Sequence, residues 1–156
     1  MTMENRGIGT RLRLLLAAMD GGVQAAYDAA GVDFRPRFFA VARHLIAHGD
    51  TGVGELAQAL SVSQPAVTQT LAEMRRAGLV TLHAATGDRR ARIARLTPEA
   101  LAMIDRLRPI WAAVARAAAA LDETLPAPLG AVLDAALDAL DQTPFDQRIA
   151  EQMERP

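Results

Sequence analysis

Residues 53–80 of the chain read VGELAQALSVSQPAVTQTLAEMRRAGLV and hold two short helical patterns separated by a tight turn. Apolar residues recur at helical spacing in each half, so each half predicts a helix with one buried face. These residues are Leu56, Ala57 and Leu60, then Val67, Leu71 and Met74. Ser63 is a candidate N-cap, because its hydroxyl can accept a hydrogen bond from a free N–H of the first turn. Two helices joined by about three residues form a helix-turn-helix, whose second helix fits the major groove of DNA.

The next residues, 81–95, read TLHAATGDRRARIAR. Short runs containing apolar residues lie on both sides of Thr86-Gly87-Asp88 and predict a β-hairpin with a glycine-containing loop. Gly78, just before the first run, suits the left-handed residue that ends a helix. Four arginines lie on or just after the hairpin tip, namely Arg89, Arg90, Arg92 and Arg95. A helix-turn-helix followed by a basic hairpin predicts a winged helix.

Composition limits the classes of protein to which the chain can belong. The 156 residues suit one domain, and 51% of them are apolar, which is typical of a globular chain. No apolar run approaches the roughly 20 residues of a membrane span, and no leader pattern precedes residue 10, so we expect a cytoplasmic protein with no membrane contact. The absence of cysteine excludes disulfides and thiol chemistry.

Charge is distributed unevenly along the chain. Residues 35–95 carry nine arginines against four acids, a net charge of +5, whereas residues 96–156 carry five arginines against ten acids, a net charge of −5. A basic middle segment beside an acidic arm indicates that the middle segment meets an anion.

Helical patterns also flank the winged helix. Residues 10–30, 98–122 and 127–141 carry long apolar, alanine-rich stripes, and Asp33 to Pro36 begin another helix that Gly49 ends. Thr97 is a candidate cap, with Pro98 at the first helical position. A small winged helix cannot cover these stripes, so we expect two copies to bury them against each other. The alternative is that the helices fold back on their own domain.

Other chemistry has little support in the sequence. His44 and His48 are four residues apart and could ligate a metal, but no carboxylate or cysteine is near them in sequence, and a place near a helix end, which the helix dipole favours for His48, is the better explanation. There is no glycine-rich phosphate loop, His-Glu-x-x-His pattern or serine elbow. We therefore expect no enzymatic activity, no cofactor and no metal site.

The chain resembles the multiple-antibiotic-resistance regulator (MarR) family of winged helix-turn-helix transcription factors over residues 10 to about 141. The resemblance rests on Glu55-Leu-Ala-Gln-Ala-Leu60, Ser63-Gln-Pro-Ala-Val67, Gly78-Leu-Val80, Asp88-Arg-Arg90 and Leu96-Thr-Pro98. It implies a mainly α-helical fold in one MarR-type domain, residues 1–156. Residues 35–96 would form the DNA-binding part, and residues 10–34 and 97–156 the dimerisation helices. It also implies a wing that reaches the minor groove and, in many members, a pocket for a small-molecule effector. The chain departs from the family pattern at Ser61, Gln69 and Thr81-Leu82.

The expected DNA-binding residues fall into three groups. Gln64, Thr68 and Gln69 face away from the apolar stripe and are candidates for base edges, with Ser63 and Pro65 at the start of the same helix. Arg75 and Arg76 are candidates for phosphate contacts. On the wing, the family motif implies that Asp88 orients Arg90; Arg89 or Arg90 would enter the minor groove, and Arg92 would hold a phosphate.

The sequence thus predicts a dimeric regulator of transcription that reads a palindromic operator, and the resemblance implies a repressor that a small-molecule effector relieves. Its partners would be double-stranded DNA, a second copy and that effector. The alternative is a winged-helix module that binds another protein and reads no DNA sequence. An aromatic pocket formed from Phe34, Phe38, Phe39, Met103, Leu107 or Trp111 is conceivable, but these residues equally suit the core.

Overall fold

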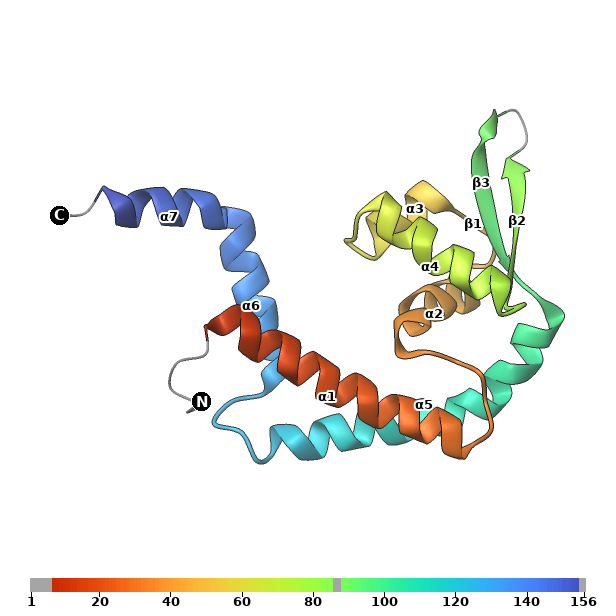
Figure 1. Ribbon diagram of the computed structural model, residues 1–156, viewed down its shortest axis with the longest axis horizontal. Coiled ribbons are helices and arrows are strands. Elements are labelled where there is room, and N and C mark those ends of the chain that lie inside the picture. Colours follow the sequence, from red (N-terminus) through yellow and green to blue (C-terminus); the bar gives the residue numbers. More distant parts are fainter. Residues whose placement is uncertain (1–6, 86–87, 155–156) are drawn as a thin grey trace. The chain divides into compact units, whose positions relative to one another are not determined.

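The computed structural model describes residues 7–85 and 88–154, and the side chains of residues 7–84 and 91–154. The chain divides after Trp111 into two compact units. Their helices and strands appear in Figure 1. The first unit contains α1 (Ile8–Ala29), η2 (Pro36–Phe38), α2 (Phe39–His48), β1 (Thr51–Gly52), α3 (Val53–Ala59), α4 (Gln64–Arg76), β2 (Val80–Ala85), β3 (Asp88–Leu96) and the first half of α5 (Pro98–Asp122). The second contains the rest of α5, α6 (Leu129–Gln142) and α7 (Phe145–Met153).

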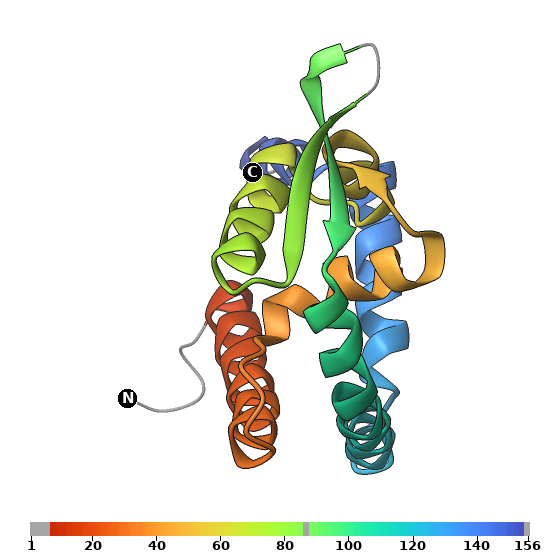
Figure 2. The ribbon, with the colours of Figure 1, turned by 90° about the vertical axis from the view of Figure 1, so that its right-hand side faces the viewer.

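Helices α3 and α4 form the predicted helix-turn-helix, and β2 and β3 form the predicted wing. The hairpin stands beside α4 and projects beyond it (Figure 2). A third strand, β1, was not predicted; it pairs antiparallel with β3, with Thr51 opposite Ala94 and Gly52 opposite Ile93. The sheet order is β1-β3-β2, so β3 ties the wing to the end of α2. The mainly helical winged-helix fold is therefore confirmed.

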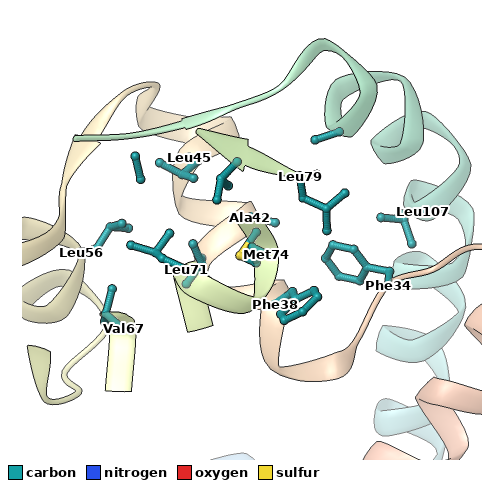
Figure 3. Packing of buried hydrophobic residues seen from close by; sticks show 14 of the residues in the cluster. Phe34, Phe38, Ala42, Leu45, Leu56, Val67, Leu71, Met74, Leu79 and Leu107 are labelled. Atoms are coloured by element: carbon teal, nitrogen blue, oxygen red, sulfur yellow. The ribbon is translucent and has the colours of Figure 1, made fainter. Parts of the chain in front are cut away.

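The core of the first unit lies between α2, α3 and α4 (Figure 3). Leu56, Val67, Leu71 and Met74 are at most 1% exposed, as their helical spacing predicts, while Leu60 is only partly buried. They pack with Val41, Ala42, Leu45, Phe34, Phe38 and Leu107. Burying one such side chain contributes roughly 1.5–3 kcal/mol, so this cluster fixes how α4 is presented.

Local capping fixes where the helices begin and end. The Ser63 hydroxyl accepts from the backbone N–H of Ala66 at 3.4 Å, and the Thr97 hydroxyl accepts from that of Ala100 at 3.1 Å. Thr97 also donates through its hydroxyl to the Gly78 carbonyl at 2.7 Å, where Gly78 ends α4 with φ +72°. In the turn between α3 and α4, Ser61 adopts φ +52°, a left-handed conformation that glycine would adopt at lower cost.

Two predicted helix starts differ from the structure. The segment after Asp33 begins with the 3₁₀ turn η2 before α2 starts at Phe39. In the second unit, α6 starts at Leu129 and not at residue 127, because the Asp122 carboxylate accepts from the Leu129 backbone N–H at 2.9 Å and caps the helix there. Arg148 donates to the carbonyls of Ala139 and Thr143 and so ties α7 to the end of α6.

Candidate nucleic-acid interface

Helix α4 turns its apolar side to the core and its polar side outward. Gln64, Pro65, Thr68 and Gln69 are all exposed, so the described part of the chain leaves this face open. Ser63, which caps the helix, is also exposed. These five residues are the predicted DNA-binding residues at the start of the helix, and they lie together on and beside its first two turns.

The hydrogen bonds within α4 limit what these side chains can offer to a base. The Thr68 hydroxyl donates to the Gln64 carbonyl at 2.9 Å, so its hydrogen is engaged and its oxygen remains free to accept. In the major groove, a free acceptor suits the amino groups of adenine and cytosine. The side-chain amide of Gln69 has no hydrogen-bond partner among the described residues, so it can still form the bidentate pair with adenine.

The arginines at the end of α4 differ in their surroundings. Arg75 and Arg76 are both exposed in the last turn, where the helix dipole favours positive charge. The Arg76 Nε donates to the Ala72 carbonyl at 3.4 Å. Beside them, Glu73 is only 14% exposed and forms an ion pair with Arg37 of η2, which the sequence gave no reason to expect.

On the wing, the structure describes Arg92 but not the side chains at its tip. Asp88, Arg89 and Arg90 belong to β3, but their side chains lie outside the described residues, so their predicted roles stay predictions. Arg92 lines an open hollow of about 710 Å³ between the wing and α4, together with Gln64 and Thr68. One wing arginine and two helix residues are thus brought to the same place.

Arg95, which sequence spacing placed with the basic tip, lies at the base of the wing. Its Nε donates to the Asp50 carboxylate at 2.7 Å, and its Nη2 to the same oxygen at 2.5 Å. This contact lowers the pKa of Asp50 and raises that of Arg95. Asp50 was not a predicted site residue, and a separation of 45 residues gives no sequence signal for the pair.

The histidines show no cation site. The His44 and His48 rings lie 4.4 Å apart at 38°, and no group of three or more His, Cys, Asp or Glu residues able to hold a metal occurs in the described part of the chain. His83 lies 2.8 Å from the Thr81 hydroxyl on the exposed side of β2.

The aromatic residues that could have lined a pocket belong to the core. Phe34 and Phe38 are 2% and 1% exposed, and Phe39 and Trp111 pack against the same cluster. The Trp111 Nε1 donates to the Tyr27 hydroxyl at 3.0 Å, and burial raises the pKa of Tyr27 despite this bond. Among the residues that the structure describes, no helix has the length and hydropathy needed to cross a membrane.

Comparisons with known proteins agree with this geometry. Residues 33–91 match the MarR family. YusO from Bacillus subtilis is 24% identical, with a TM-score of 0.52 over 87% of this chain and 93% of its own. BpsR from Bordetella bronchiseptica, studied for regulation of its DNA binding by 6-hydroxynicotinic acid, is 18% identical, with a TM-score of 0.67 over 90% and 97%.

A mutant of MarR from E. coli, solved in complex with operator DNA, is 19% identical, with a TM-score of 0.64 over 85% of this chain and 92% of its own. No curated protein sequence matches the chain. At these identities the solved structures establish the fold alone. The family match identifies the family to which residues 33–91 are related. Residues 33–91, with α2, the helix-turn-helix and the start of the wing, therefore belong to the MarR family.

Proposed function

We propose that this protein is a dimeric transcription regulator that binds a palindromic operator as a repressor and releases it when a small-molecule effector binds. One observation carries the proposal: the polar face of α4 is exposed along Gln64, Pro65, Thr68 and Gln69 and stands beside an arginine-bearing wing. A helix and hairpin in this arrangement suit adjacent major and minor grooves.

Residues 35–96 would supply the DNA-binding part. Gln64, Thr68 and Gln69 would read base edges, while Ser63 has a hydroxyl hydrogen left to donate to a phosphate. Arg75, Arg76 and Arg92 would neutralise phosphates, and Arg89 or Arg90 would enter the minor groove. Asp50 would act through Arg95, by holding the base of the wing in place.

Residues 10–34 and 97–156 would supply the dimer contacts. No residue of α6 or α7 is buried in the described chain, and an apolar stripe along α6 is exposed at Val132, Leu133, Leu137 and Leu140. On α1, Leu12, Leu16 and Met19 are exposed as well. An isologous two-fold dimer would cover such stripes and present two copies of α4, one to each half-site.

Two solved relatives support the DNA-binding and the ligand-responsive parts of the proposal, one each. One was solved on operator DNA, and the other was studied for control of its DNA binding by 6-hydroxynicotinic acid. This chain would likewise change its DNA binding when a small molecule binds.

The test is selection of bound duplexes from a random pool, repeated at roughly 50 and 200 mM salt. We expect a palindromic consensus and an affinity that falls by orders of magnitude between the two salt concentrations, because several phosphates are neutralised. Failure to retain any duplex at the lower salt concentration would refute DNA binding and favour the alternative, a winged helix that binds another protein.

A further inference from the structure

Helix α4 has a hollow along each of two opposite flanks. The hollow on the wing side is the one lined by Gln64, Thr68 and Arg92. A second hollow, of about 340 Å³, lies between the last turns of α4 and the segment that leads into η2. Gln64 lines the first hollow and Glu73 lines the second. The two residues are nine positions apart, which is two and a half helical turns, so they lie on opposite sides of α4.

The second hollow is polar and carries an excess of positive charge. Its charged lining consists of Arg35, Arg37 and Arg76 against Asp33 and Glu73, which leaves one positive charge in excess. A neighbouring hollow of about 330 Å³ shares Arg35 and Arg37. Arginine guanidinium groups are well suited to phosphate oxygens, because they donate several parallel N–H groups.

The three arginines of this hollow differ in how many contacts they already make with neighbouring groups. Arg37 forms an ion pair with Glu73, and its guanidinium carbon lies 5.9 Å from the centre of the Phe38 ring, so both its charge and its position are fixed. Arg76 uses its Nε on the Ala72 carbonyl. Among the described residues, Arg35 has no hydrogen-bond or ion-pair partner, so its guanidinium can take a ligand from outside.

The dimensions of DNA decide what lies beside α4 when the helix occupies a major groove. An α-helix with its side chains is about 10–12 Å across, and the major groove of B-DNA is about 12 Å wide. A helix in the groove therefore has a phosphate backbone along each flank. If α4 lies in the groove, the backbone away from the wing passes the hollow that holds Arg35 and Arg76.

We propose that Arg35 and Arg76 bind backbone phosphates on the flank of α4 away from the wing, and that the Arg37–Glu73 pair supports them. The inference rests on the proposed function and extends the DNA-binding surface to the residues before α2. The wing and this hollow would hold the two backbones of one major groove. These contacts carry no base information, so they contribute to affinity equally on every sequence.

The salt dependence of binding tests the proposal on the full-length protein with a selected duplex, followed by fluorescence anisotropy. Removing one protein–phosphate interaction lowers the slope of log K against log salt by about 0.9. The quantity to compare is the ratio of the affinity at roughly 50 mM salt to the affinity at roughly 200 mM salt. This ratio should be smaller than that of the wild type by about 3.5-fold for Arg35→Ala and by about 12-fold for Arg35→Ala/Arg76→Ala. Preference among base sequences should not change.

Arg108→Ala is the matched control, because it removes one exposed arginine from α5 that pairs only at 3.6 Å with Asp105 among the described contacts. It should leave the slope unchanged. A second measurement alters the DNA instead: neutral methylphosphonates at single backbone positions should weaken the wild type, and the Arg35→Ala variant should lose nothing further at the same positions. This arm does not depend on how the double variant folds.

The outcomes separate this inference from the proposed function. A wild type that binds no duplex at the lower salt concentration overturns both. A wild type that binds DNA with the expected slope, beside a double variant with the same slope, overturns only the phosphate contacts. An unchanged slope together with weaker binding of inorganic phosphate in the double variant would also overturn them, and would identify the hollow as a site for a small oxyanion.

Discussion

Replacing Leu137 by aspartate should separate the two copies of the proposed dimer. Leu137 lies on the apolar stripe of α6 and is 62% exposed in the chain, so the change leaves the core of the protomer untouched. In a dimer that covers the stripe, the same change removes apolar burial and places a carboxylate where water has been excluded.

The exposed fraction sets the magnitude. Full burial of a leucine contributes roughly 1.5–3 kcal/mol, so covering the remaining 62% contributes roughly 1–2 kcal/mol per protomer. The residue occurs twice in a two-fold dimer, which gives roughly 2–4 kcal/mol and a dissociation constant raised roughly 30- to 800-fold. The buried carboxylates would raise it further.

Sedimentation equilibrium of wild type and variant measures this constant directly. Ala131→Asp is the control, because it adds the same carboxylate on the opposite side of α6, away from the apolar stripe. The control should dimerise like the wild type. The reasoning is refuted if the wild type is a monomer at micromolar concentration, or if Leu137→Asp dimerises as tightly as Ala131→Asp does.

Three further changes have expected results. Gln69→Ala should cost about 1–3 kcal/mol at particular base pairs, measured by competition among single-substituted operators; a uniform decrease at every position would contradict base reading. Gly49→Ala should destabilise the fold by about 1–3 kcal/mol in urea unfolding, because φ +75° and ψ −151° suit only glycine. Gly54→Ala is the control: an added Cβ has open space at both positions, but Gly54 has no positive φ, so this change should not destabilise the fold. Asp50→Asn should remove part of the acid dependence of thermal unfolding. The lowered pKa of Asp50 means that its contribution is complete above the ordinary value of 3.8 and fades as pH falls through the lowered one, so the two proteins should converge in acid.

Sequence reasoning succeeded where the controlling interaction is local. The Ser63 and Thr97 caps, the left-handed Gly78 and the buried stripe of α4 each depend on residues within a few positions, and all are confirmed. The departure from the family pattern at Ser61 was also visible in the sequence, and the structure gives this residue a φ of +52°, which glycine would adopt at lower cost.

It failed where distant parts of the chain meet. Strand β1 is two residues long and forms only because β3 pairs with it, so no apolar periodicity in the sequence predicts it. Arg95 looked like part of the basic tip because its partner, Asp50, is 45 positions earlier. The arginine hollow beside η2 likewise forms only after Arg35 and Arg76 are brought together by the core.

Thr97 links the segment between α4 and β2 to the start of α5 through its side chain and its backbone N–H. Its hydroxyl donates to the carbonyl of Gly78 and accepts from Ala100, and its backbone N–H donates to the Leu79 carbonyl at 3.0 Å. The segment that follows α4 and the first turn of α5 are therefore held together and cannot move independently. In the proposed dimer, an effector that shifts the first turn of α5 would therefore also shift the end of α4, without contacting any of the residues proposed to read DNA.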